Sequence, residues 1–143
     1  MRHRKTAKKL GRNTSHRSAL RKNLMTAVLL SKNLRICTTL PKAKFVKPDL
    51  EKIITLGRKK DLHRYRRALG ILQDEAAVAR LFNEIGPAFA KSGRPGGYTR
   101  IIKLARRRLG DGGAQAFLEI LKEGGTAPKK KRRFSLKKKK AAG

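Results

Sequence analysis

The sequence predicts an α+β fold of two layers, in which helices cover one face of a small antiparallel sheet of about three strands. Apolar residues recur at helical spacing in four separate stretches between residues 15 and 85. Three short segments, residues 34–39, 98–106 and 114–120, alternate or carry β-branched residues instead. A sheet of this size cannot shield both of its faces, so we expect helices to form the second layer, in the order α-β-α-α-α-β-β.

The first helix and the first strand are expected before residue 40. Thr14 or Ser15 can cap a helix over about Ser15 to Ser31, because both side chains can accept a hydrogen bond from the first turn. Leu34 to Thr39 then changes to β-branched, alternating residues, which predicts a short strand.

The second helix is expected to begin beside a proline and to contain another. Pro41 follows Thr39 closely, and proline is favourable in a first helical turn. Pro48 lies within the apolar stripe that follows, where proline removes a backbone donor and clashes with the preceding turn. We therefore expect a kink or a short break near Lys44 to Lys47.

Two further apolar stripes predict two more helices. The stripes cover residues 62–72 and 78–85, and Asp74 is a possible cap for the second helix. Gly86 and Pro87 are expected to end this run, because both residues interrupt helices.

The last part of the predicted domain reads as a hairpin. Residues 91–97, KSGRPGG, have the glycines and the proline of a loop, and Tyr98 to Arg106 reads as a strand. Residues 114–120 alternate, and the intervening LGDGG, Leu109 to Gly113, suits an antiparallel turn.

The charge of the chain is strongly basic and unevenly distributed. The 143 residues carry 39 Lys or Arg and nine Asp or Glu, a formal net charge of +30. All nine acidic residues lie within residues 49–127. Repulsion at this charge density destabilises a compact monomer and favours a polyanionic partner, of which nucleic acid is the leading candidate. We divide the chain into a basic arm (residues 1–13), a single folded domain (residues 14–123) and a basic low-complexity tail (residues 124–143).

The sequence offers little for catalysis or metal binding. His3, His16 and His63 lie far apart, with no Cys or acid at metal-ligand spacing near them, and no carboxylate pair, nucleophile motif or phosphate-binding loop is found. We expect no enzyme activity, metal, cofactor or small-molecule substrate. Cys37 is the single cysteine, which fits a reducing compartment. No stretch approaches the roughly 20 apolar residues of a membrane span.

The basic arm is the first candidate nucleic-acid contact. Met1 to Lys22 carries nine Lys or Arg and no acid. It has too few large apolar groups to offset the entropy of ordering, so we expect it to stay mobile until it meets a polyanion. The residues alone leave open a mitochondrial transit peptide for this end. For the tail they leave open a solubility segment, a sorting signal or an RNA-binding arm.

Two further candidates flank the hairpin. Gly96 and Gly97 leave the backbone free to approach a phosphate, although a tight loop entry explains these glycines equally well. The side chains around them are Arg94, Tyr98 and Arg100, and Tyr98 is more readily a residue at the core edge than a partner for base stacking. Three consecutive arginines, Arg106 to Arg108, must point to both faces of a strand, so at least one should face solvent or phosphate.

A series of short motifs resembles one known family. The chain begins with MRHRK, Met1 to Lys5, and continues in order with SHR, TTLPKAK, ITL, LFNEIGP, GGYTRI, GD and EIL. This ordered set spans roughly residues 1–122 and is similar to that of bacterial ribosomal large-subunit protein seventeen. Residues 106–109 and 112–116 depart from the pattern usual in that family, and the tail lies outside it.

The resemblance implies a structural, rRNA-binding protein of the large ribosomal subunit, placed near the peptide exit tunnel in the cytoplasmic ribosome. The implied partners are large-subunit rRNA and neighbouring large-subunit ribosomal proteins, with no membrane. In that family the basic N-terminus belongs to the mature protein, which disfavours the transit peptide. A DNA-architectural protein is the alternative function, and a nuclease is a weaker one. The candidate RNA-binding residues are Arg2, His3, Arg4, Lys5, Lys8, Lys9, Arg12, His16, Arg17, Arg21, Lys42, Lys44, Arg94, Tyr98, Arg100, Arg106, Arg107 and Arg108.

Overall fold

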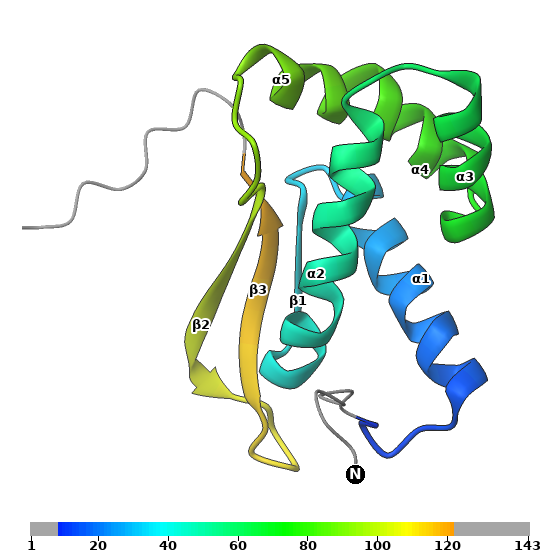
Figure 1. Cartoon of the computed structure of the whole chain (residues 1–143). Helices are drawn as coiled ribbons and strands as arrows, with labels where there is room; N and C mark the ends of the chain where they lie inside the picture. Colours follow the sequence, from blue (N-terminus) through cyan, green and yellow to red (C-terminus); the bar gives the residue numbers. More distant parts are fainter. Residues whose placement is uncertain (1–8, 122–143) are drawn as a thin grey trace, which may run out of the picture.

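The computed structural model describes residues 9–121 and has an α+β architecture, as the sequence predicts (Figure 1). The elements in chain order are α1 (Thr14–Leu30), β1 (Arg35–Thr39), α2 (Leu40–Gly57), α3 (Leu62–Leu72), α4 (Glu75–Arg80), the π-helical turn η1 (Leu81–Ile85), α5 (Gly86–Lys91), β2 (Thr99–Arg107) and β3 (Ala114–Ile120). The predictions for residues 1–8 of the arm and for the chain from residue 122 onward lie outside the described residues.

The three strands form one antiparallel sheet in the order β1-β3-β2. On the central strand β3, Ala116, Leu118 and Ile120 are buried, whereas the residues between them are partly exposed. The buried side of the sheet packs on α2, and Figure 1 shows the helices on this side. The two layers therefore enclose one apolar core, which is the arrangement expected when a small sheet can be covered on one face.

The cap of α1 is Asn13, which precedes both of the expected caps, Thr14 and Ser15. The side-chain oxygen of Asn13 accepts a hydrogen bond from the backbone nitrogen of His16 at 2.8 Å. Asn13 also has the extended backbone of a cap residue, with φ −70° and ψ 173°. Asparagine is at least as good a cap as serine or threonine, so the first strong cap along the chain is the one used.

The break expected before Pro48 is absent, because α2 runs without interruption from Leu40 to Gly57. Proline inside a helix is unfavourable by about 3 kcal/mol. Val46, Leu50 and Ile54 of the same helix are fully buried in the core. Burying a large aliphatic side chain contributes about 1.5–3 kcal/mol. The packing of three such residues outweighs the proline, and the helix stays whole.

The helix expected to end at Gly86 and Pro87 continues through both residues as α5. The π-helical turn η1 shifts the hydrogen-bond register just before Pro87, whose nitrogen has no hydrogen to donate. Gly86 is needed for packing, because a Cβ there would lie 2.0 Å from the carbonyl oxygen of Gly57. The glycine that reads as a stop signal is therefore the point where α2 and α5 make their close approach.

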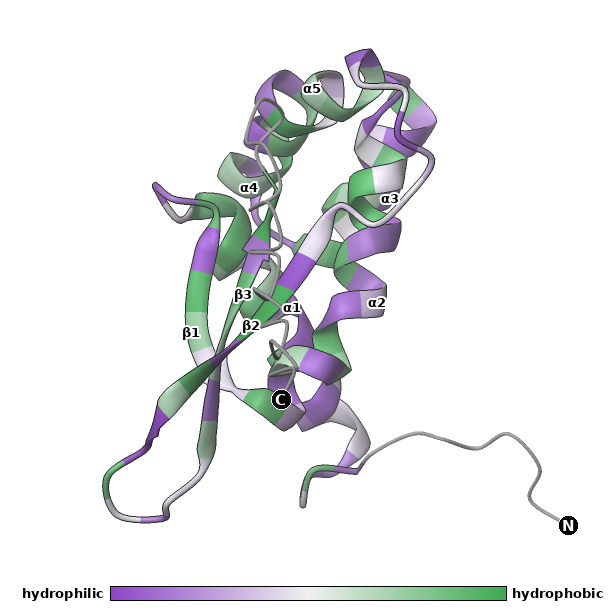
Figure 2. Cartoon of the chain, turned by 90° about the vertical axis from the view of Figure 1, so that its left-hand side faces the viewer, coloured by the Kyte–Doolittle hydropathy of each residue, from purple (hydrophilic) through white to green (hydrophobic). Residues whose placement is uncertain are grey.

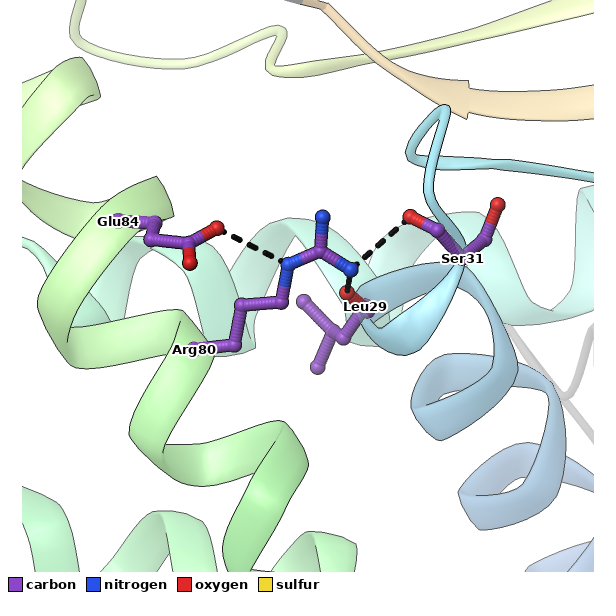
Figure 3. Close-up of polar contacts among 4 residues, drawn as sticks. All are labelled: Leu29, Ser31, Arg80 and Glu84. Carbon is purple, nitrogen blue, oxygen red and sulfur yellow. Dashed lines mark hydrogen bonds and ion pairs between the residues drawn. The ribbon is translucent and has the colours of Figure 1, made fainter.

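A partly buried arginine joins α4 to the end of α1 (Figure 3). Nη1 of Arg80 donates to the carbonyl oxygens of Leu29 at 2.8 Å and Ser31 at 3.0 Å, and Nε pairs with Glu84 at 3.0 Å. The last carbonyls of a helix lack partners within the helix and carry partial negative charge. Arg80 therefore satisfies the end of α1 from a neighbouring helix.

A carboxylate on α2 fixes the beginning of β2. Glu51 accepts hydrogen bonds from the backbone nitrogens of Tyr98 at 3.0 Å and Thr99 at 2.9 Å, and from the hydroxyl of Thr99. Tyr98 is fully buried and Thr99 is 5 % exposed. Because this end of the strand is closed to water, the buried N–H groups there depend on Glu51 for hydrogen-bond acceptors. The same contacts connect the helical layer to the sheet.

Candidate nucleic-acid interface

The basic arm enters the fold at a fixed point, the start of α1. Nη1 of Arg17 donates to the carbonyl oxygen of Arg12 at 2.6 Å, and Nη2 lies 3.3 Å from the hydroxyl of Thr14. Arg17 thus holds the path of the chain just before the helix. Lys9 and His16 are exposed beside it and have no such contact among the described residues. The first turn of a helix also favours anions, because its backbone N–H groups point outward.

A basic hairpin extends past the short strand β1 (Figure 2). β1 pairs with only five residues of β3, whereas β2 runs on to Arg107 after a shift of register beyond Lys103. Lys103, Arg106 and Arg107 are exposed, and none of the ion pairs among residues 9–121 includes them. These three side chains therefore face solvent, as the sequence predicts for at least one of the arginines at 106–108.

Arg108, the third predicted arginine, is engaged within the hairpin turn. Its guanidinium makes two contacts with the carboxylate of Asp111, and that carboxylate also accepts from the backbone nitrogen of Gly113 at 3.1 Å. The hydrogen bond from Arg108 is the main reason that the pKa of Asp111 lies far below its usual value, with a further contribution from Gly113. Arg108 thus shapes the turn that the other arginines flank.

The start of α1 and the hairpin turn lie at the same end of the molecule, as Figures 1 and 2 both show. The loop between α5 and β2, which holds Arg94, lies at the opposite end of the sheet (Figure 1). The structure therefore places the start of α1 and the hairpin turn at one end of the fold, and it leaves the loop with Arg94 apart from them.

The prediction that Tyr98 contacts RNA is wrong. Its ring is 0 % exposed and cannot stack on a base. Its hydroxyl receives a hydrogen bond from Arg58 at 3.2 Å and lies 3.1 Å from the carbonyl oxygen of Pro95. The ring also packs on Phe89, with centroids 4.8 Å apart. Tyr98 is thus a core residue that fixes the loop, as expected for an aromatic residue with a polar end.

The remaining predicted residues in the described part of the chain have mixed environments. Arg100 approaches Glu119 at 3.8 Å across the sheet, with 36 % of its side chain exposed. Lys44 is exposed near the beginning of α2, whereas Lys42 is half-buried. Arg94 is exposed in its loop. The structure places these side chains at the surface without gathering them at one site.

A groove of about 790 Å³ between α1, α2 and α3 adds basic residues that sequence reasoning missed. Its cationic lining comes from all three helices and consists of Arg21, Lys22, Lys52, Arg64 and Arg67, with His63 beside them. Of these residues, only Arg21 was a candidate. The missed signal is the polar face of α3, where Arg64 and Arg67 are three residues apart and therefore share one side of the helix.

One acidic residue, Asp49, also lines this groove. Its carboxylate lies 3.2 Å from Nε of Arg21 and 3.9 Å from Nζ of Lys52. The Arg21 contact is an ion pair without hydrogen-bond geometry, since Nε is buried and has no hydrogen-bond partner. The guanidinium also lies 4.7 Å from the centre of the Phe45 ring. Arg21 is thus held in place, while Arg64 and Arg67 are absent from the ion pairs of residues 9–121.

Among the described residues, no group of three or more His, Cys, Asp or Glu side chains could hold a metal ion. In the same part of the chain, every helix is too short or too polar to cross a bilayer. The exposed lysines and arginines of the hairpin and the groove suit the binding of polyanions.

Comparison with known proteins places these features in a family. The family described as ribosomal protein L17 matches residues 20–121. A protein from Acidobacterium capsulatum named large ribosomal subunit protein bL17 is 50 % identical over 121 residues, which are 85 % of this chain and 72 % of that protein. Proteins of the same name from Koribacter versatilis and Magnetococcus marinus are 48 % and 45 % identical, over 85 % and 89 % of this chain and 72 % and 98 % of their own lengths.

The match covers the whole sheet and the helices from residue 20 onward, so it includes the hairpin, most of α1 and the groove lining apart from Ser18. On this evidence the chain belongs to the ribosomal protein L17 family, whose members are structural proteins and not enzymes.

Proposed function

We propose that this chain is a structural component of the large ribosomal subunit that binds large-subunit rRNA and stabilises it during assembly. The observation that carries the rRNA contact is the basic end of the fold, which holds both the start of α1 and the hairpin turn (Figure 1). The relatives named above are large-subunit proteins, and a place in that particle supplies the polyanion that this surface requires. The proposal includes a position near the peptide exit tunnel, contacts with neighbouring ribosomal proteins and residence in the cytoplasm.

In this proposal the positive charge provides the affinity for rRNA, and the fold determines which phosphates the basic side chains can reach. Each phosphate neutralised by Lys or Arg releases counterions, so about 6–10 such contacts weaken binding by roughly 10³–10⁵-fold between about 50 and 200 mM salt. The hairpin and the arm leave the fold from fixed points, so they can reach only those phosphates whose spacing matches them. We further propose that residues 14–123 fold as one domain, with the arm and the tail as extensions.

A sedimentation experiment tests the proposal. The chain, carrying an affinity tag at its C-terminus, is expressed in a bacterium, and the lysate is separated on a sucrose gradient in low salt. We expect the protein to co-sediment with large subunits and to leave them as salt is raised. Its presence only at the top of the gradient, even in low salt, would exclude the proposal.

A competition experiment separates rRNA from DNA as the partner. The purified chain is bound to large-subunit rRNA and challenged with duplex DNA of equal phosphate concentration. We expect the DNA to displace little of the protein, because shape as well as charge selects the RNA. Equal displacement by DNA would favour a DNA-architectural protein.

A further inference from the structure

The groove between α1, α2 and α3 contains a glycine that the fold itself does not require. Gly70 lies within α3, is exposed and has no positive φ, so neither a turn nor strain explains it. A Cβ at Gly70 would meet no atom within 4 Å, whereas one at Gly57 would lie 2.8 Å from Cγ of Leu81. Glycine inside a helix is less favourable than alanine. The missing side chain therefore relieves no contact among residues 9–121, and it leaves the groove open at this point.

The floor of the groove is apolar. Met25 and Ile53 are each 2 % exposed and line it together with Leu56 and Ile71, which are partly exposed. The volume of about 790 Å³ lies within the range of roughly 300–1,000 Å³ that is usual for pockets that enclose small ligands. A flat, weakly polar group of the size of a nucleobase can be buried there.

The rim of the groove is cationic. Five Lys or Arg and one Asp line it, and the Asp is already shared by Arg21 and Lys52. Lys22, Arg64 and Arg67 remain for an external anion, and the planar guanidinium groups of the two arginines bind phosphate with two donors each. The apolar floor can therefore contact a base, and the cationic rim can contact the phosphates, as a nucleotide-binding site requires.

We propose that this groove binds an unpaired, looped-out nucleotide of large-subunit rRNA. The base lies on the apolar floor, and the flanking phosphates contact Arg64 and Arg67. Recognition of RNA commonly targets such unstacked bases, since paired bases in an A-form helix are hard to reach. The proposal rests on the proposed function and adds a specific binding site to it. An acidic segment of a neighbouring protein is the competing occupant.

Filling the groove tests the site with a change that preserves charge. Gly70→Leu places a side chain in the open mouth and improves helix propensity, so we expect the free protein to unfold at the same or a higher temperature. We also expect its affinity for large-subunit rRNA from Acidobacterium capsulatum, measured by filter binding, to fall by about tenfold. The control is Ala76→Leu, at an exposed position of α4 outside the groove, which should leave affinity unchanged. Equal affinity of the two variants would overturn the proposal.

Two arginines of the same helix provide a control matched in charge. Arg67 lines the groove, whereas Arg66 is exposed on α3 and does not line it. We expect Arg67→Gln to weaken rRNA binding several-fold more than Arg66→Gln at the same salt concentration. Equal effects would mean that only overall charge matters, which would contradict a specific site.

Cross-linking identifies the occupant. A photoreactive benzoylphenylalanine replaces Thr55, an exposed residue of the groove lining, in the full chain assembled into large subunits. We expect a cross-link to one nucleotide that is unpaired in the rRNA. A cross-link to a protein, or to no molecule while the chain still co-sediments with subunits, would overturn this inference and leave the proposed function intact. Loss of co-sedimentation by the unmodified chain would instead overturn both.

Discussion

The contact between Glu51 and the beginning of β2 makes a quantitative prediction for stability. Glu51→Gln keeps the shape of the side chain but replaces one acceptor oxygen by an NH₂ group. The two backbone N–H groups of Tyr98 and Thr99 and the Thr99 hydroxyl then compete for a single oxygen. At least one buried donor loses its partner and faces another donor.

The expected loss follows from this geometry. A hydrogen bond to a charged group contributes about 1.5–3 kcal/mol, and a buried donor left without a partner costs about 1–3 kcal/mol. We expect Glu51→Gln to lower the free energy of unfolding by about 3 kcal/mol, which is a large part of the roughly 5–15 kcal/mol typical of a small domain.

Urea unfolding followed by circular dichroism measures this change, with Glu84→Gln as the control. Glu84 has 66 % of its side chain exposed and pairs with Arg80, so its replacement should cost only about 0.5 kcal/mol. Hydrogen exchange should also become faster at the Tyr98 and Thr99 amides in the Glu51 variant. A loss below about 1 kcal/mol, with both amides still protected, would refute the role assigned to Glu51.

Three further predictions concern packing, salt and pH. Gly86→Ala should destabilise the fold by about 3 kcal/mol or more in the same urea assay, because its Cβ would overlap the carbonyl of Gly57; a change under about 1 kcal/mol would contradict that contact. Arg106→Gln combined with Arg107→Gln should lower the salt dependence of rRNA binding by about two units of the log–log slope, and an unchanged slope would mean that neither residue contacts phosphate. The pKa of Asp111 is lowered in the folded hairpin, so the order that it gives the turn should be complete above the usual carboxyl pKa of about 4, decline as pH falls below that value, and be lost only when pH falls through the lowered pKa of the folded turn. NMR shifts of Gly113 report the protonation of Asp111 in the folded turn, and a titration of these shifts centred at the usual carboxyl pKa would contradict the lowered pKa.

The elements of the fold could be predicted where the local pattern and the tertiary packing agree. The strand at residues 35–39 and the hairpin with its LGDGG turn follow directly from alternation and turn chemistry. The cap at Asp74 is also confirmed, since its carboxylate accepts from the backbone nitrogen of Ala77 at 2.8 Å. These features depend on neighbours in the sequence, so the sequence displays them.

The predictions that differ from the structure concern features determined by contacts between residues far apart in the sequence. The short break expected before Pro48 and the helix end expected at Gly86 are both absent, because core packing in the first case and the approach to Gly57 in the second outweigh these local signals. Likewise, the groove needs three helices to lie side by side, so the pattern of any one helix could show only a basic face. Tyr98 is buried by a contact with Phe89 that local pattern does not reveal.

The structure also divides the arginines by role, which net charge cannot do. Arg80 binds the carbonyls at the end of α1, Arg58 binds the hydroxyl of Tyr98, and Arg108 binds Asp111. A guanidinium whose donors are used inside the fold must give up those contacts before it can bind a phosphate fully. Removing such an arginine should therefore change stability or loop geometry more than the salt slope, whereas removing Arg106 or Arg107 should do the reverse. The positive charge of the sequence thus comes from two groups of residues, those bonded within the fold and those free to bind phosphate. Only the second group should determine where the protein lies on rRNA.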